Sequence, residues 1–320
     1  MAKGKRVGVI HGGWTPDTIC GRKSAADIIP CLLDRGYEVV QFDIDYTRVN
    51  RQLREADVDV VINQTAGKYG ETGMLQHVMG TLGIPYTGSG PLASMLSHDK
   101  LIWKQLLAEA GLETIPFMMF HLMDSNEAVM AKILATLGLP VILKPVDQGF
   151  SIGVFVAQKE EELDECITQS RKYGENTLVE KYLAEGTEID VGILERKDEL
   201  IVFPTAEYVS LDPQQLFCST ADKLAAVKKY RWEIPAASLS ADTDRLIGEY
   251  TKRIFRLLRM SGFARIDFMV AGDAIYASDI ALLPTMARNT QWGKGLVQLG
   301  IEYADFAEGL ITNIEFETKV

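Results

Sequence analysis

The first third of the chain alternates short apolar runs with helical patterns. Three runs rich in β-branched residues stand at 6–13 (RVGVIHGG), 37–44 (YEVVQFDI) and 57–64 (DVDVVINQ). Between the first two, residues 24–36 carry apolar side chains at helical spacing and end at Gly36. This alternation predicts a parallel sheet with helices on its faces. Ligands of such sheets gather at the carboxyl ends of the strands, where residues 11–15 and 65–73 fall.

Length and charge limit the classes of protein to consider. A chain of 320 residues suits two or three modules, and no apolar run is long enough to cross a bilayer. The N-terminus predicts a first strand and not a secretion signal. The net charge of −11, without a basic tract, disfavours binding to nucleic acid or anionic membranes. The four cysteines lack C-x-x-C spacing, so we expect reduced thiols in a cytoplasmic protein.

Glycines and prolines in TLGIPYTGSGPLASM interrupt the alternating pattern and predict a domain boundary near residue 90. We expect three domains, at 1–90, 91–188 and 189–320. The second opens with a helix that Ser97 caps and Gly111 ends. Further expected elements are strands in 114–121, 140–145, 153–158 and 177–183, a helix at 125–137, strands within 189–208, a helix at 241–260 and a hairpin turning at 271–273.

A lysine closes one of these apolar strands. Lys144 ends VILKP, and the stretch DQGFSIG that follows offers glycines, a hydroxyl and several free backbone N–H groups. A loop of this kind suits phosphate oxygens, although it has neither P-loop nor G-x-G-x-x-G spacing. The alternative is an edge strand whose last side chain reaches back to water.

Two later stretches carry carboxylates. LVEKYLAEGTEIDVGIL places Glu180 and Glu188 around a turn, where backbone groups and carboxylates suit an adenine and a ribose. ARIDFMV places Arg265 and Asp267 on one face of a strand, and Asp279 follows on the return strand. These three side chains form either a structural ion pair or a Mg²⁺ site beside a cationic group.

Five stretches together resemble the D-alanine:D-alanine ligases of the ATP-grasp superfamily, from Val7 to about Gly300. They are KYGETGMLQHVMGTLGIPYTGSGPLASMLSHDK, ILKPVDQGFSIGV, VEKYLAEGTEIDVGIL, ARIDFMV and LLPTM. The resemblance implies an α/β chain with the ATP-grasp fold: an N-terminal Rossmann-like βα domain, a central α+β domain and a C-terminal α+β domain. ATP would lie between the last two.

The resemblance also implies roles for individual residues. Lys100 and Lys144 would contact the ATP phosphates under the loop 149–153, and Arg265 would stabilise the oxyanion of the tetrahedral intermediate. Asp267 and Asp279 would carry Mg²⁺. Asp17, Glu71 and Ser151 stand where the family orients its first substrate, and Ser151 also belongs to the phosphate loop. The adenosine would be held by Glu180, Lys181, Tyr182, Leu183 and Glu188.

The reaction implied by the family joins two amino acids. A substrate carboxylate attacks the γ-phosphate of ATP, and an amine then displaces phosphate from the acyl phosphate to form an amide. The chain would thus be an ATP-dependent, ADP-forming ligase with ATP and Mg²⁺ as cofactors and small amino acids as substrates. Family members are commonly homodimers through the N-terminal domain, and we expect the same here.

Several positions depart from the family pattern. The family's metal motif E-x-N reads Asp279, Ile280, Ala281 here, and alanine cannot coordinate a metal. Thr285 replaces a glycine. Phe150 replaces the first serine of G-S-S in the phosphate loop, and Asp17 is one methylene shorter than the usual glutamate.

The remaining departures lie in the lid and the second substrate region. No lid motif F-Y-D-Y-E-x-K-Y can be aligned, and residues 288–291 (RNTQ) replace the usual surroundings of the second substrate's carboxylate. These changes favour two alternatives to a D-alanine ligase. One is a specialised amide ligase with non-alanine substrates, and the other is a homologue that binds ATP but has lost turnover.

Three further features leave two interpretations open. The stretch 210–230, with Lys223, Lys228 and Lys229, is either a lid over the phosphates or a disordered surface loop. Glu71 either meets the substrate or caps a helix beginning near Thr72. Trp14 and Trp292 either line a pocket or pack in a core or interface.

Overall fold

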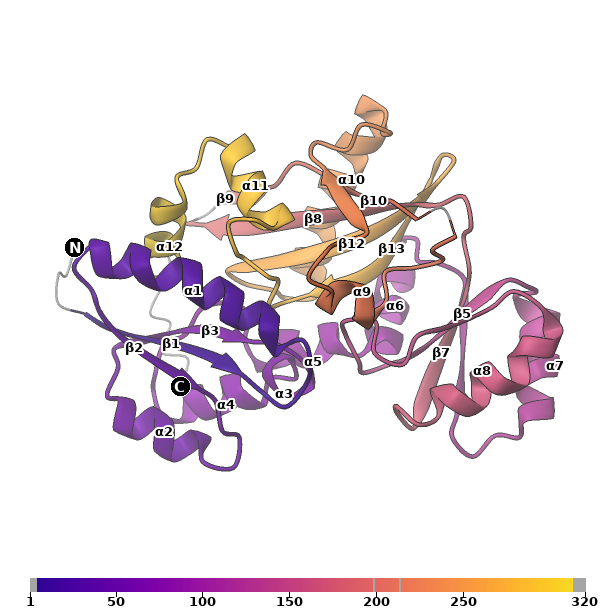
Figure 1. Ribbon diagram of the computed structural model, residues 1–320, viewed down its shortest axis with the longest axis horizontal. Helices are drawn as coiled ribbons and strands as arrows, with labels where there is room; N and C mark the ends of the chain where they lie inside the picture. Colours follow the sequence, from indigo (N-terminus) through magenta and orange to yellow (C-terminus); the bar gives the residue numbers. More distant parts are fainter. Residues whose placement is uncertain (1–4, 198, 213, 313–320) are drawn as a thin grey trace.

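The computed structural model describes residues 5–197, 199–212 and 214–312 (Figure 1). Its N-terminal part is a parallel three-stranded sheet in the order β2-β1-β3, as the alternating pattern predicts. Long helix α1 and short helix α2 provide the crossovers, because parallel strands cannot be joined by a tight turn. The bounds are β1 Arg6–Gly12, α1 Thr18–Asp34, β2 Glu38–Asp43, α2 Val49–Ala56 and β3 Val60–Thr65.

Four helices follow: α3 Lys68–Glu71, α4 Met74–Thr81, α5 Pro91–His98 and α6 Lys100–Glu109. The expectation that Ser97 caps a helix was wrong, since Ser97 lies inside α5. Extended backbone at Asp99 separates α5 from α6, and its carboxylate accepts hydrogen bonds from the N–H groups of Leu101 and Ile102 at 2.9 and 3.0 Å. Asp99 is therefore the N-cap.

The central part is a four-stranded antiparallel sheet in the order β4-β7-β5-β6. Helices α7 and α8 pack on one face around buried Val129, Ile133 and Ile167. This body lies at one end of the molecule (Figure 1). Its elements are β4 Phe117–His121, α7 Asn126–Thr136, β5 Val141–Pro145, β6 Phe155–Ala157, the 3-10 turn Glu160–Glu162, α8 Leu163–Ser170 and β7 Asn176–Lys181.

The C-terminal part is built on a six-stranded sheet, ordered β11-β10-β8-β12-β13 with β9 paired to β8. The strands are β8 Thr187–Arg196, β9 Glu199–Val202, β10 Ala206–Ser210, β11 Tyr230–Glu233, β12 Phe263–Ala271 and β13 Ala274–Ala281. The helices are α9 Thr220–Leu224, α10 Ala241–Leu257, α11 Gln291–Gln298 and α12 Tyr303–Thr312. The expected hairpin is confirmed. The stretch 210–230 is less irregular than expected, since it contains α9.

Packing crosses both expected domain boundaries. Trp103 and Leu107 of α6 are buried in one core with Phe255 and Phe268 of the C-terminal part. At the other end of the chain, α12 packs against α1, where Arg35 forms ion pairs with Asp305 and Glu308. The boundaries at 90 and 188 stay predictions.

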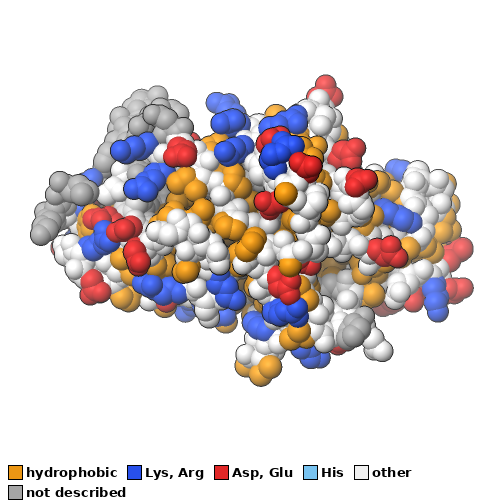
Figure 2. Space-filling view, turned by 90° about the horizontal axis from the view of Figure 1, so that it is seen from above, with side chains coloured by type: hydrophobic (Ala, Val, Ile, Leu, Met, Phe, Trp, Pro, Cys, Tyr) orange, Lys and Arg blue, Asp and Glu red, His pale blue; other side chains and the backbone are white. Residues whose placement is uncertain are grey.

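Among the described residues, no helix is long and apolar enough to span a membrane. On the face shown in Figure 2, acidic and basic side chains are interspersed among apolar and neutral ones.

The corrected cap gives a stability prediction. Asp99→Ala removes the acceptor of two helix N–H groups, so we expect the free energy of unfolding to fall by about 1 kcal/mol. Ser97→Ala is the matched control, because the buried Ser97 hydroxyl has no hydrogen-bond partner within the described residues. Urea unfolding followed by fluorescence measures both. A larger loss in Ser97→Ala than in Asp99→Ala would contradict the assignment.

Candidate functional site

A row of three carboxylates crosses the C-terminal sheet. Strand register sets Asp267 of β12 opposite Asp279 of β13 on one side and opposite Asp190 of β8 on the other. The expected pairing of Asp267 with Asp279 follows directly from the hairpin. Asp190 was missed by the sequence reasoning. The sequence did contain a signal for Asp190. Glu188 and Asp190 stand two residues apart and therefore share a face of β8.

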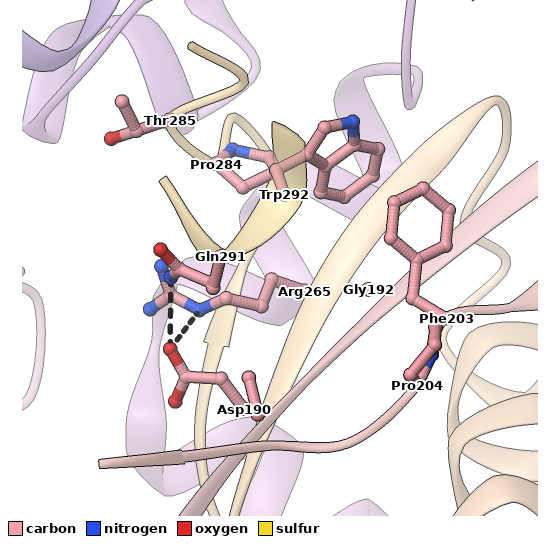
Figure 3. A pocket seen from close by; sticks show the side chains of 10 residues that line it. Asp190, Gly192, Phe203, Pro204, Arg265, Pro284, Thr285, Gln291 and Trp292 are labelled. Carbon is pink, nitrogen blue, oxygen red and sulfur yellow. Dashed lines mark hydrogen bonds and ion pairs between the residues drawn. The ribbon is translucent and has the colours of Figure 1, made fainter. Parts of the chain in front are cut away.

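Arg265 is held by two members of this row. Its Nε and Nη2 donate to the two Asp267 carboxylate oxygens at 2.7 and 2.8 Å, and its Nε lies 3.3 Å from Asp190 Oδ2. Gln291 Nε2 donates to the same Asp190 oxygen at 3.0 Å (Figure 3). Burial raises the pKa of Asp190 well above its usual value, and the charge of Asp267 raises it further. The structural ion pair considered above is therefore present.

A small cavity lies beside this cluster. Its volume is about 10 Å³, enough for one water molecule. Arg265, Asp190 and Gln291 lie on one side and the rings of Phe203 and Trp292 on another (Figure 3). Trp292 is 2% exposed, and its ring centroid lies 4.5 Å from that of Phe203. It is therefore a core residue that also lines this cavity.

Lys144 points inward from the central sheet. Strand β5 lies between β7 and β6, which contradicts the alternative of an edge strand reaching back to water. The Lys144 Nζ lies 2.6 Å from Glu180 Oε2 and donates to the Ser278 carbonyl of β13 at 3.3 Å. Lys144 thus joins the central sheet to the C-terminal sheet.

Glu180 binds a second lysine that sequence reasoning missed. Lys104, on α6, is fully buried and its Nζ lies 2.5 Å from Glu180 Oε1. Burial lowers the Lys104 pKa to about 8. Burial alone would raise the Glu180 pKa, but the two lysines outweigh it and lower that pKa. The sequence offered no signal for Lys104, which looks like any polar residue of an amphipathic helix.

Positive groups from two parts of the chain converge on Asp279. Lys100 Nζ lies 3.4 Å from Asp279 Oδ1 and donates to the Gln148 carbonyl at 2.7 Å. Burial alone would raise the Asp279 pKa, but Lys100, Lys144 and Arg265 together lower it to about 2. These three cations therefore share one site.

The loop 149–153 touches the stretch 210–230. Ser151 Oγ donates to the Cys218 carbonyl at 2.7 Å, and Thr220 Oγ1 donates to the Phe150 carbonyl at 2.9 Å. Lys223 Nζ donates to Ser151 Oγ at 2.8 Å. These contacts favour a lid over a disordered surface loop. Of the three lysines considered there, Lys223 is bonded to the phosphate loop, whereas Lys228 Nζ donates to the Asp222 carbonyl at 3.3 Å.

Several polar groups of the segment expected to hold adenosine already form hydrogen bonds within the chain. Lys181 Nζ donates to the Leu139 carbonyl at 2.8 Å, and the Tyr182 N–H donates to the Pro140 carbonyl at 3.0 Å. The Leu183 carbonyl accepts from the Gly186 N–H at 3.0 Å. Glu188 is the second residue of β8, where burial and the charge of Asp267 raise its pKa.

Asp17 and Glu71 meet at the carboxyl ends of the N-terminal strands. Glu71 accepts a hydrogen bond from the Gly67 N–H at 3.1 Å, at the start of α3. It therefore does not cap a helix near Thr72, and the next helix begins at Met74. Burial and the charge of Asp17 raise the Glu71 pKa to about 8, and the charges of Asp279 and Lys100 also act on it. Glu71 thus lies near the cation site.

The described residues include no set of three or more His, Cys, Asp or Glu side chains arranged to hold a metal ion. Two carboxylates in register, Asp267 and Asp279, remain. Mg²⁺ in nucleotide sites is commonly bound by one or two carboxylates together with phosphates and waters. The donor set fits such an ion.

The Glu71 pKa gives a prediction of pH dependence. Between its ordinary value of 4.5 and about 8, the folded chain binds more protons at Glu71 than the unfolded chain does, so this group's stabilising effect is lost as pH rises. Glu71→Gln cannot titrate. We expect the unfolding free energy of the wild type, minus that of the variant, to fall between pH 5 and pH 9 in urea titrations. An equal or growing difference would contradict the shift.

Comparisons with known proteins agree with this geometry. The family described as D-ala D-ala ligase C-terminus matches residues 106–312. A D-alanine–D-alanine ligase of Desulforudis audaxviator is 32% identical over 96% of this chain and 97% of its own. The ligase of Geotalea uraniireducens is also 32% identical, over 97% and 95%.

Solved structures share the fold. The D-alanine–D-alanine ligase of Bacillus anthracis complexed with ATP superposes with a TM-score of 0.79 at 25% identity, covering 97% of both chains. The D-alanyl-alanine synthetase A of Vibrio cholerae gives a TM-score of 0.86 at 23% identity, covering 98% of this chain and 99% of its own. The expected ATP-grasp fold is confirmed, and this chain belongs to the D-alanine–D-alanine ligase family.

Proposed function

We propose that the protein is an ATP-dependent ligase that joins the carboxylate of one amino acid to the amine of another. The observation that carries this proposal is the meeting of Lys100, Lys144 and Arg265 around Asp279, between the central and C-terminal sheets. A protein with a net charge of −11 needs such a local cluster to hold a triphosphate. The relatives named above support the same activity.

The chemistry solves a leaving-group problem. Hydroxide leaves a carboxylate poorly, so one carboxylate oxygen first attacks the γ-phosphorus of ATP and ADP departs. The amine nitrogen then attacks the acyl carbonyl, phosphate departs and the nitrogen loses its extra proton. Lys100 and Lys144 neutralise phosphate oxygens, and Arg265 stabilises the negative charge of the tetrahedral intermediate.

Water must be kept from the acyl phosphate. The bonds from Thr220 and Lys223 to the loop 149–153 support a lid of residues 210–230 that closes over the phosphates. Ser151 links the two segments. Its contacts support a role in closing the site beside the substrate-orienting role expected from the sequence.

The adenosine contacts divide unequally among the expected residues. Glu180 is committed to two lysines, so its role is to hold Lys144 in place. Adenine then falls to the backbone of Tyr182 and Leu183, where the Tyr182 carbonyl is the acceptor because its N–H is used. The Glu188 carboxylate suits the ribose hydroxyls. Lys181, bonded to the Leu139 carbonyl, shapes this end of the site.

Mg²⁺ would be held by Asp267 and Asp279. When bound, such an ion neutralises charge on the β- and γ-phosphate oxygens. Ala281, opposite Arg265 in the strand register, supplies no ligand. This position is the observation that favours a second candidate function, an ATP-binding protein without turnover. A homodimer and a cytoplasmic location stay predictions.

Removing a charged side chain from the site tests the activity. ADP release with ATP, Mg²⁺ and D- or L-amino acids, singly and in pairs, detects turnover, and mass spectrometry identifies the product. We expect Lys144→Ala and Asp267→Ala each to lower the rate at least about 10²-fold. Met123→Ala, at a side chain 81% exposed in the central part, is the control.

The outcomes separate the two candidates. Amino-acid-stimulated ADP release supports the ligase. Thermal stabilisation by ATP without ADP release for any amino acid pair supports the binding protein. Full activity in a correctly folded Lys144→Ala or Asp267→Ala variant, judged by its melting temperature, would refute the site.

Restoring the metal ligand tests Ala281. In Ala281→Asn an amide oxygen joins the two carboxylates, and we expect the Mg²⁺ concentration for half-maximal ATP-dependent stabilisation to fall several-fold. Thermal melting in a Mg²⁺ series with fixed ATP measures this without requiring turnover. Identical Mg²⁺ dependence in wild type and variant would place residue 281 away from the metal.

A further inference from the structure

Three aromatic rings gather at the carboxyl ends of the parallel N-terminal strands. Trp14 follows β1, Tyr46 follows β2, and Tyr69 lies in α3 after β3. The Trp14 ring centroid lies 5.3 Å from that of Tyr46 and 4.9 Å from that of Tyr69, and the two tyrosines are 5.4 Å apart. Trp14 is nevertheless 57% exposed, which is unusual for so large an apolar side chain packed against others.

A carboxylate oxygen without a partner lies near these rings. Asp17 is 5% exposed, and its Oδ1 has no hydrogen-bond partner within the part of the chain that the structure describes. A buried carboxylate oxygen left unpaired is costly unless a ligand satisfies it. Gly67 keeps the space beside this oxygen clear, because a Cβ there would lie 2.7 Å from Asp17 Oδ1 and 2.1 Å from Thr15 Oγ1.

The acid pair Asp17 and Glu71 lies within electrostatic reach of both the rings and the cation site. Asp17 and Glu71 act on the Tyr46 hydroxyl and, after burial, raise its pKa. Glu71 is also within the influence of Lys100 and Asp279. Lys68, next to Tyr69, forms an ion pair with Asp147 at the start of the phosphate loop. An amino acid with its carboxylate toward the lysines and its ammonium on Asp17 would turn its side chain to the rings.

We propose that Trp14, Tyr46 and Tyr69 form the side-chain site of the acid substrate and select an apolar side chain larger than a methyl group. This inference rests on the proposed function, since it names the substrate class of the same site. Three rings offer far more apolar surface than a methyl group covers. Each additional methylene buried against such a surface improves kcat/KM about tenfold or more.

Hydroxylamine separates this question from the identity of the amine substrate. Its nitrogen attacks the acyl phosphate carbonyl, phosphate leaves, the nitrogen loses a proton, and a coloured hydroxamate accumulates with ferric ion. The assay uses the full chain with ATP, Mg²⁺ and the D- and L-forms of alanine, valine, leucine and phenylalanine. We expect the kcat/KM for leucine or phenylalanine to exceed that for alanine of the same hand by about tenfold or more.

Variants of the rings identify the source of the preference. Trp14→Ala should lower the ratio of the larger substrate to alanine about tenfold, and Trp14→Phe should lower it less. Met123→Ala, an exposed apolar side chain of the central part, should keep the ratio. Melting temperatures establish that each variant is folded.

Each result decides between defined alternatives. Preference for alanine, or an unchanged ratio in folded Trp14→Ala and Trp14→Phe, overturns the side-chain site while hydroxamate formation upholds the ligase. No hydroxamate with any of the eight amino acids, together with no ADP release in the paired screen, overturns the proposed function and this inference with it.

Discussion

One buried carboxylate shared between two lysines organises the candidate site. Glu180 is 1% exposed and its two oxygens bind Lys104 from α6 and Lys144 from β5. A buried charge is costly alone, but each partner offsets the cost of the others. Because two ammonium groups share one carboxylate, the trio keeps a positive charge inside the protein. Lys144 carries that charge across to the Ser278 carbonyl of the facing sheet.

The C-terminal sheet carries an excess of negative charge. Asp190, Asp267 and Asp279 form a row, with Arg265 as the cation that the same sheet provides. Lys100 and Lys144 come from the other side of the site. The lysines on one side of the site therefore contact the carboxylates and carbonyl groups of the other side. A bound nucleotide would take over the lysines from these contacts. Asp190 gives Arg265 a second carboxylate, so the guanidinium would keep an anchor if Asp267 bound the proposed Mg²⁺.

Sequence reasoning reached the parts of this arrangement that depend on local pattern. Strand alternation predicts the parallel sheet, and the spacing of Arg265 and Asp267 predicts their common face. It missed Lys104, because a helical lysine with a buried partner far along the chain looks like an exposed one. It placed the helix cap at Ser97, whereas the Asp99 carboxylate accepts the hydrogen bonds from the first N–H groups of α6. Such features depend on tertiary contacts that no short window of sequence contains.

The two tryptophans show the same limit of prediction from sequence. Trp14 and Trp292 were equivalent in the sequence, yet one is 57% exposed at the strand ends and the other is 2% exposed beside Phe203. The difference comes from what each ring packs against.

The departures from the family pattern are unevenly distributed. Lys100, Lys144 and Arg265 keep the family pattern, whereas Asp17 and residues 288–291 depart from it where the family meets its substrates. Phosphoryl transfer needs positive charge at fixed places, because the charge on the transferred group is the same whatever acid receives it. A substrate side chain imposes no such demand. Phe150 and Ala281 are the departures on the nucleotide side, and at Ala281 phosphates and waters could complete a magnesium shell that two carboxylates would begin. The charged groups that phosphoryl transfer needs in this family are therefore present in the chain, while several positions near the family's substrates differ.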